Sequence, residues 1–376
     1  MRVIYSIGAK FAGGGIGNTA YHAVQGLHRH GLLHRLLCGS YKPTEIPRDR
    51  IRAVGLPSRA LRKLAVYDRT RWITYLHNVL YDRWAAQRME PCEVFHGWSA
   101  FCQRSMARAT ELGATTIVER PLSHPQYRIP LLREEHAKWG IRYQSPSHAW
   151  KRVLKELARA DYVLIPSDFV RQSFLKQGFP EKRLVQIPFG VDTQRFRPAD
   201  ERTGHPFRVL FLGQVSYQKG IAYLLAAWKQ LGWADAELWI VGRQDRNIGS
   251  ALSQYRAVQG IRWLGYVTDP VNLLRQADVF AFPSLQEGSA LVTYEALASG
   301  LPIITTPNAG SVVRHGEDGF IIPIRDSEAL AARLVELRGD PSLRKAMGRS
   351  ARKRAEEYPW GRYQNTLAES MCNLLG

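Results

Sequence analysis

Two glutamates separated by seven residues, Glu287 and Glu295, occupy the stretch EGSALVTYEALASG. Strand-like apolar runs precede and follow it, so both acids stand where a buried sheet and helix would favour apolar residues. Gly288 permits a sharp turn, after which the pattern predicts a helix whose first backbone amides face a ligand. Those amides belong to Ser289, Ala290 and Leu291. We expect both glutamates to border one cavity, although an acid near a helix N-terminus is also favourable with the helix dipole alone.

A glycine-rich turn follows the first predicted strand, in the sequence GAKFAGGGIGNTAYHAV. Gly14, Gly15 and Ile16 stand where this turn leads into a helix, a geometry that suits a phosphate or a sugar. The glycines do not follow the GxGxxG spacing in the usual place, and no acid stands convincingly about 20 residues further on, so a dinucleotide site is only weakly supported. The alternative is that the glycines serve a tight turn and close helix packing.

Two more candidate side chains follow predicted strands. Lys219 comes at the end of GQVSYQKG, just before a predicted helix, where its ammonium group can reach a pyrophosphate as a point charge. Taken alone, such a lysine is more typical of an ordinary surface position. His96 stands near the end of the strand EVFHGW. A lone histidine in a strand is more often structural than catalytic.

The elements that must position these residues alternate between short strands and longer helices, which predicts parallel sheets covered by helices. The strand-like runs are residues 2–8, 34–39, 93–98, 115–119 and 162–166 in the first half, and 207–213, 236–242, 261–265, 278–284 and 301–305 in the second. A proline- and charge-rich stretch after Ile187 separates the two sets, so we place a domain boundary near residue 195. The tail after Pro359 is a helix candidate that could dock on either domain.

Length and composition agree with two soluble α/β domains. The chain has 376 residues, of which 45% are hydrophobic and 23% charged, and no apolar run approaches the roughly 20 residues that cross a bilayer. The N-terminus lacks a secretory signal pattern, so a cytoplasmic location is expected. Four widely spaced cysteines suggest neither a disulfide framework nor a zinc site, and no cluster of His, Asp and Glu has ligand spacing. We therefore expect no metal.

The net charge of +19 is concentrated in the first half: residues 1–196 carry 31 Lys and Arg against 15 Asp and Glu. Within residues 48–72, leucines and a valine interleave with eight arginines and lysines. Such a segment can lie on an anionic lipid surface, and nucleic acid would also attract it. A solvated basic face that only aids solubility is the third reading.

Taken together, these segments resemble the retaining glycosyltransferases of family 4, the glycosyl transferases of group 1, which have the GT-B fold. The likeness covers most of the chain, and its most specific part is the pair of glutamates in EGSALVTYEALASGLPIIT. Supporting segments are VLFLGQVSYQKG, LVQIPFGVDTQRFRP, ADVFAFPS, GGGIGN and EVFHGW. The resemblance implies two Rossmann-like domains that face a central cleft. Residues 1–195, joined by the C-terminal helix 360–376, would bind the acceptor, and residues 196–359 would bind the nucleotide sugar.

The resemblance also implies roles for the candidate residues. Glu287 would bind hydroxyls of the donor sugar, Glu295 the ribose, and Lys219 the pyrophosphate leaving group. Gly288, Ser289, Ala290 and Leu291 would hold the sugar and its phosphate, while Gly14, Gly15 and Ile16 would close over the phosphates. His96 matches a position directed at the transferred sugar.

One position departs from the family pattern. Many relatives have an arginine where this chain has Gln214, which can donate a hydrogen bond but supplies no charge. Another cation would have to compensate, with Arg243 and Arg120 as the candidates, or phosphate binding would depend more on backbone amides. The sequence does not decide between these alternatives.

The expected function is therefore metal-independent transfer of a sugar from a nucleotide diphosphate sugar to a lipid-linked or polysaccharide acceptor at the inner face of a membrane. The nucleotide sugar is a co-substrate, and no cofactor is expected. Alternatives with the same fold are a nucleotide-sugar epimerase and a glycan phosphorylase. A nucleic-acid-binding protein is not favoured, because residues 48–72 match no known nucleic-acid motif.

Overall fold

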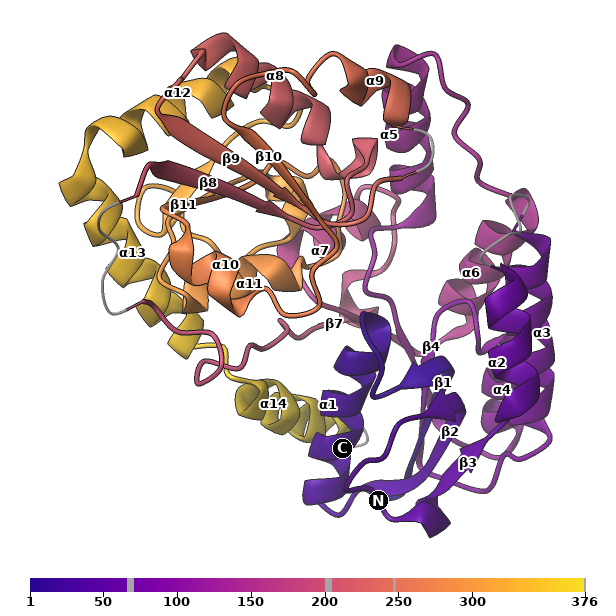
Figure 1. The fold of residues 1–376 in the computed structure, drawn as a ribbon. Coiled ribbons are helices and arrows are strands. Elements are labelled where there is room, and N and C mark those ends of the chain that lie inside the picture. The colour runs from indigo at the N-terminus through magenta and orange to yellow at the C-terminus, as the bar shows by residue number, and fades with distance from the viewer. Residues whose placement is uncertain (66–70, 200–204, 246–247, 375–376) are drawn as a thin grey trace.

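The structure, a computed structural model, describes residues 1–65, 71–199, 205–245 and 248–374. Its two lobes are each built on one parallel sheet (Figure 1). The first sheet has the order β3-β2-β1-β4-β5-β6-β7. Its strands are β1 (Val3–Phe11), β2 (Leu33–Tyr41), β3 (Ile51–Ala53), β4 (Val94–Trp98), β5 (Thr115–Glu119), β6 (Tyr162–Ile165) and β7 (Leu184–Gln186). Part of the basic segment 48–72, residues 66–70, lies outside the described residues.

The second sheet has the order β10-β9-β8-β11-β12-β13. Its strands are β8 (Phe207–Leu212), β9 (Ala236–Val241), β10 (Ile261–Gly265), β11 (Val279–Phe282), β12 (Ile303–Thr305) and β13 (Gly319–Ile321). All ten predicted strands form, which confirms the expected pair of parallel-sheet units. The strands that sequence reasoning missed, β3, β7 and β13, are three-residue strands at sheet edges, too short to give an apolar run.

Helices cover both sheets, as parallel strands with two buried faces require. The first lobe contains α1 (Ile16–Arg29), α2 (Leu56–Ala65), α3 (Trp72–Ala86), α4 (Gln103–Glu111), α5 (Pro125–Lys138), α6 (Ser147–Arg159) and α7 (Asp168–Leu175). Later helices are α8 (Ile221–Leu231), α9 (Gly249–Ser253), α10 (Val271–Gln276), α11 (Leu291–Ala298), α12 (Ser327–Gly339), α13 (Pro341–Glu356) and α14 (Trp360–Asn373). Short 3-10 turns are η1 (Arg48–Arg50), η2 (Glu181–Arg183), η3 (Tyr217–Lys219) and η4 (Pro307–Ala309).

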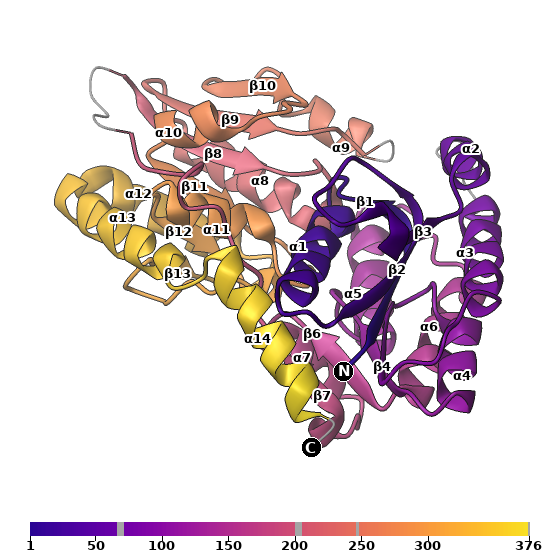
Figure 2. The same cartoon turned by 90° about the horizontal axis from the view of Figure 1, so that it is seen from below.

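The predicted C-terminal helix forms and returns to the first lobe, where α14 lies alongside α1 (Figure 2). Gln364 of α14 donates to the side chain of Gln25 at 2.6 Å and accepts from Arg29 at 3.0 Å. The chain thus crosses between the lobes twice, and Val191 of the first crossing forms a β-bridge to Pro359 of the second. The expected boundary at residue 195 falls within the first crossing, between β7 and β8, and stays a prediction.

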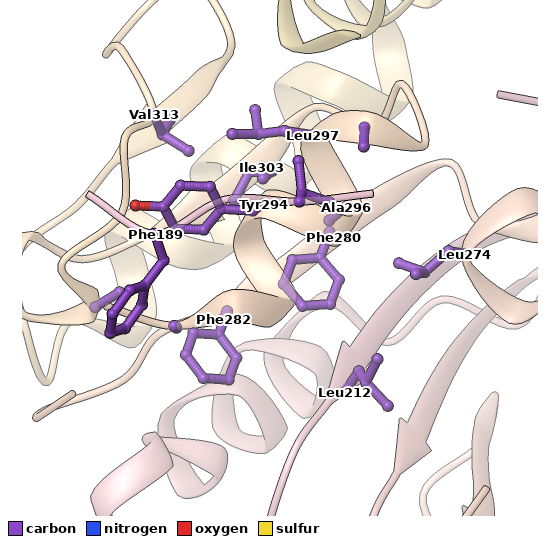
Figure 3. Packing of buried hydrophobic residues seen from close by; sticks show 14 of the residues in the cluster. Phe189, Leu212, Leu274, Phe280, Phe282, Tyr294, Ala296, Leu297, Ile303 and Val313 are labelled. Atoms are coloured by element: carbon purple, nitrogen blue, oxygen red, sulfur yellow. The ribbon is translucent and has the colours of Figure 1, made fainter. Parts of the chain in front are cut away.

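The helix that carries Glu295 is anchored in the core of the second lobe. In Figure 3, Tyr294 and Leu297 of α11 lie over Phe280 and Phe282 of β11, and all four side chains are almost completely buried. Because such cores are close-packed, α11 and the end of β11 fix the positions of both ends of the loop between them. That loop contains Glu287.

None of the helices in the described ranges is both long and apolar enough for a bilayer crossing. The four cysteines are free thiols, three of them buried and Cys372 exposed.

Candidate functional site

The ion pair between Lys219 and Glu287 is the centre of the candidate site. Lys219 ends η3, and its Nζ contacts Oε1 of Glu287. Gly220 follows with a left-handed φ of 68°, and a Cβ there would lie 1.9 Å from the carbonyl oxygen of Pro283. Only glycine lets the two loops approach this closely. The structure therefore brings together two residues that lie 68 positions apart in sequence.

Hydrogen bonds hold the Glu287 loop in place. The Glu287 amide donates to the carbonyl of Asn308 at 2.9 Å, and the Ser284 hydroxyl donates to the carboxylate at 3.3 Å. The Leu285 amide donates to the carbonyl of Gln218 at 2.9 Å, which ties this loop to η3. The side chains of Lys219 and Glu287 keep 18% and 13% of their surfaces exposed, so a ligand can reach both without unfolding the loop.

The segment after Glu287 is pressed against the first lobe. A Cβ on Gly288 would lie 1.2 Å from the carbonyl oxygen of Pro121, and the Ser167 hydroxyl donates to the Gly288 carbonyl. The Ala290 amide donates to the carbonyl of Ala309 at 3.1 Å, so the expectation that this amide faces a ligand is wrong. The Ser289 hydroxyl is hydrogen-bonded to Tyr294 at 2.9 Å. Any anion cradle here depends on the neighbouring amides of this segment, such as that of Leu291.

Glu295 lines a cavity of about 510 Å³ between α11, α1, the first crossing segment and α14. Burial raises the pKa of its carboxyl to about 7, although the nearby Arg195 acts in the opposite direction. Leu291, Asn18 and Trp360 also line this cavity, but Glu287 does not. The expectation that both glutamates border one cavity is therefore wrong for the cavity that Glu295 lines.

The glycine-rich turn of the first lobe stands beside a second cavity. Gly14 and Ile16 line a space of about 390 Å³ together with Lys10, Asn78 and Phe101. Gly15 precedes α1 with a φ of 59°, and no atom beyond its chain neighbours lies within 4 Å of where its Cβ would be. Ligand-sized space therefore exists at this turn, as a phosphate- or sugar-binding loop needs.

His96 is placed differently from the expectation. It lies within β4 with none of its surface exposed, and its Nε2 is 3.0 Å from Oε2 of Glu119, also buried. The Tyr5 hydroxyl donates to the same carboxylate oxygen at 3.0 Å. In this structure His96 belongs to a buried polar cluster of the first sheet, so the expected contact with a transferred sugar is contradicted. Side chains alternate along a strand, and the sequence did not reveal on which face His96 lies.

Two family models cover most of the chain between them. The model for Glycosyltransferase Family 4 matches residues 13–195, and the model for glycosyl transferases group 1 matches residues 206–340. The chain belongs to glycosyltransferase family 4. The two matches meet at the crossing between the lobes.

Individual family 4 relatives match only in part. The chain is 34% identical over 188 residues to the phosphatidyl-myo-inositol mannosyltransferase of Mycolicibacterium smegmatis, which covers 47% of this chain and 48% of the relative. It is 31% identical over 158 residues to the capsular polysaccharide biosynthesis glycosyltransferase CapM of Staphylococcus aureus, covering 40% of this chain and 41% of the relative. The chain thus spans about half the length of the curated relatives it matches.

The fold matches over the whole chain. The crystal structure of HepE from Anabaena in complex with UDP and glucose superposes with a TM-score of 0.70, covering 99% of this chain and 100% of that one at 14% identity. At this identity the likeness shows the fold alone, and it confirms the predicted GT-B architecture.

The position that departs from the family 4 pattern, Gln214, is exposed and donates weakly to Asp245 at 3.4 Å. Of the two candidate compensating cations, Arg243 is exposed and covers the ring of Tyr266 at 4.4 Å. Arg120 lies at the carboxyl end of β5, buried, directly before the Pro121 carbonyl that meets Gly288. Of these two, only Arg120 stands in a segment that contacts the Glu287 loop.

Sequence reasoning missed the contacts that hold the lobes together. Arg325 of the second lobe donates to Glu135 of α5 at 2.8 Å and to Glu134 at 2.7 Å. Tyr223 of α8 donates to Glu135 at 2.9 Å. Glu135 is fully buried, and an acid in the apolar spacing of α5 was the one signal that could have indicated an inter-lobe pairing.

The described residues contain no group of three or more His, Cys, Asp or Glu side chains arranged to hold a metal ion.

Proposed function

We propose that this family 4 protein is a retaining, metal-independent glycosyltransferase, which moves a sugar from a nucleotide diphosphate sugar to a lipid-linked or polysaccharide acceptor. The observation that carries the proposal is the contact between Lys219 and Glu287 in front of α11. A cation beside an acid suits a ligand that has a charged phosphate next to a hydroxyl-rich sugar. The relatives named for a mannosyltransferase and a capsule glycosyltransferase, and HepE with UDP and glucose, support this chemistry.

In this proposal the donor lies along the Glu287 loop. Glu287 accepts hydrogen bonds from sugar hydroxyls, and Lys219 neutralises charge that grows on the departing diphosphate. Glu295, on the next turns of α11, accepts from the ribose hydroxyls. Gly288, Ser289 and Leu291 border the sugar and its phosphate, and Gly14, Gly15 and Ile16 close over the phosphates from the first lobe.

The proposed reaction takes place on one face of the sugar. The bond from the anomeric carbon to the phosphate oxygen breaks, and the bond to the acceptor oxygen forms on the same face. The acceptor proton passes to a departing phosphate oxygen, so atoms and charge balance without a protein nucleophile. Lys219 and the amides at the start of α11 would supply the positive charge that a divalent ion provides elsewhere.

We further propose that α2 and α3 rest on the inner face of an anionic membrane. Their exposed apolar side chains are Leu56, Leu64, Trp72, Leu76 and Leu80, with exposures between 47% and 76%. Three of them stand four residues apart on one face of α3, and the basic side chains of Arg59, Lys63 and Arg71 are exposed beside them. Apolar anchors among cations are the chemistry of a peripheral lipid surface, each cation contributing about 1 kcal/mol. Both helices lie on the outer side of the first lobe, away from the second (Figures 1 and 2).

The test of transfer is a panel of UDP, GDP and ADP sugars, each incubated with the protein, EDTA and candidate acceptors, with release of nucleotide diphosphate as the readout. Proton NMR of the product then gives the anomeric configuration. An isomerised sugar nucleotide formed from the donor alone would indicate an epimerase rather than a transferase. Inversion of the anomeric configuration in the product would refute the same-face reaction.

The membrane proposal has a separate test. Cosedimentation with vesicles of phosphatidylglycerol should fall with rising salt and with Leu76→Ser together with Leu80→Ser. Val335→Ser serves as the matched control, since that exposed apolar residue is on α12 of the other lobe. Equal binding to neutral vesicles would refute the proposed preference for an anionic membrane and would leave the transfer proposal intact.

A further inference from the structure

The guanidinium of Arg120 is buried without a carboxylate partner. Only 6% of Arg120 is exposed, and within the described ranges no acid forms an ion pair with it. Its hydrogen bonds are two long ones, to the hydroxyl of Ser99 at 3.4 Å and to the carbonyl of Ser123 at 3.3 Å. Its Nε is buried and has no partner among the described residues. Buried arginines are normally paired, so this one lacks its expected anion.

A second arginine stands close by. Burial, and after it the charge of Arg128 on α5, lowers the pKa of Arg120 to about 9, while the buried Glu156 acts in the opposite direction. Arg120 is therefore charged at neutral pH. The Nε of Arg128 is also buried and without a partner in the described part of the chain. Burial and the charge of Arg120 lower the pKa of the neighbouring His124 to about 4, so this imidazole adds no charge. The carboxylate of Glu156, which acts on Arg120 from a distance, forms its ion pair with Arg152 instead. Two cations therefore share one region, and within the described residues neither has an ion-pair partner.

This region touches the Glu287 loop. The Gln286 side chain donates to the Ser123 hydroxyl at 3.1 Å, and Ser123 also accepts from Arg120 through its carbonyl. Pro121, the residue after Arg120, has its carbonyl against Gly288. Arg120 therefore stands at the carboxyl edge of the first sheet, at the point where that sheet meets the loop that the proposed function assigns to the donor.

An uncompensated buried charge destabilises a fold, and replacing it by an apolar residue is often neutral or stabilising. A buried arginine without an ion pair, beside a second arginine and next to this junction, is best explained by an anion that arrives with a ligand. Guanidinium groups match phosphate oxygens in geometry and charge. On the second lobe, Gln214 supplies no positive charge. Lys219 is therefore the one cation of that lobe that the proposed function assigns to phosphate.

We propose that Arg120 and Arg128 form a phosphate-binding site on the first lobe, opposite Lys219. The phosphate belongs either to the donor diphosphate or to a phosphorylated acceptor. This inference rests on the proposed function in one respect, the assignment of the Glu287 loop to the donor. The presence of an anion site at Arg120 and Arg128 does not depend on that function. Binding of the phosphate would tie the first lobe to the Glu287 loop.

The test compares Arg120→Met with Arg159→Met, which removes an exposed arginine from the same lobe. Isothermal titration at constant low salt measures the affinity for UDP, and then for inorganic phosphate with UDP at saturation. A donor site predicts that Arg120→Met weakens UDP binding by about 10- to 100-fold while uridine binding is unchanged. An acceptor site predicts unchanged UDP binding and loss of the phosphate that binds after UDP. Arg159→Met should do neither.

Thermal unfolding separates a ligand site from a structural one. Without ligand, Arg120→Met should unfold at the wild-type temperature or higher, and the stabilisation by the bound phosphate should shrink. If Arg120→Met does not fold, the same titrations are made with Arg128→Met, which changes a half-buried position. Unchanged binding of UDP and of phosphate in the folded variant would overturn the proposal. Lost phosphate binding in a protein that transfers no sugar would preserve this site and refute only the proposed function.

Discussion

The contact between Gly288 and Pro121 predicts a large effect from a single methyl group. In Gly288→Ala the new Cβ would lie 1.2 Å from the Pro121 carbonyl oxygen, and real Cβ contacts are essentially never under 3.0 Å. The backbone must therefore move by at least about 1.8 Å. Gly288 does not have a positive φ, so alanine is compatible with its backbone conformation and the effect is steric. Misplacement of a site by about 1 Å can cost about 100-fold in rate.

We expect Gly288→Ala to lower kcat/KM for sugar transfer by about 100-fold or more. Overpacking of this kind costs about 1 to 3 kcal/mol of folding free energy, so the protein should still fold. Donor turnover by nucleotide diphosphate release gives the rate, and small-angle scattering reports whether the lobes separate. Gly339→Ala is the control, because no atom outside its own helix backbone and chain neighbours lies within 4 Å of its Cβ position, and its φ is not positive.

The reasoning would be refuted by a Gly288→Ala variant with wild-type turnover and an unchanged scattering profile. It would also fail if Gly339→Ala lowered turnover equally, because the loss would then not depend on the junction between the lobes. Loss of turnover with unchanged lobe separation would locate the shift in the Glu287 loop itself, and a crystal structure of the variant would show it.

Three other predictions concern the proposed donor site. Lys219→Ala and Glu287→Ala should each lower kcat by about 100-fold with little change in melting temperature, and wild-type kcat in either would contradict its role. Glu295 has a pKa of about 7 and is proposed to bind the ribose as a carboxylate, so UDP affinity should rise about tenfold from pH 6 to pH 8. Glu295→Gln should remove the part of this pH dependence that belongs to the carboxyl group. Gln214→Arg should tighten UDP binding several-fold at low salt, and an equal gain for uridine would exclude a phosphate contact.

The architecture could be predicted because its signal is local. Strands such as Val3–Phe11 and Phe207–Leu212 are mostly buried on both faces and are therefore rich in apolar residues. Edge strands such as Leu184–Gln186 carry no such run, since only part of their surface is buried. The tail helix was visible from its pattern after Pro359, whereas its position against α1 depends on contacts between residues more than 300 positions apart.

The site was predicted less completely, because hydrogen bonding and orientation are decided by tertiary contacts. The resemblance to family 4 assigned Glu287 to the donor sugar and Lys219 to its pyrophosphate, and the structure brings these two side chains together. The same reasoning placed His96 at the sugar, but β4 turns its side chain toward Glu119 in the sheet interior. It also counted the Ala290 amide as free, although the Ala309 carbonyl occupies it.

The Glu287 loop is held from both lobes, and this has a consequence for how ligand binding and lobe closure are coupled. From the second lobe it is tied by Asn308, and from the first it is tied by Ser167 and by the contact at Pro121. A ligand phosphate between Lys219 and Arg120 would add attraction across the same junction. Any ligand that prefers this closed arrangement shifts the lobes toward it by its difference in affinity between the two states. Cations on both lobes would thus make the diphosphate part of the closing force, which a site confined to the second lobe could not do.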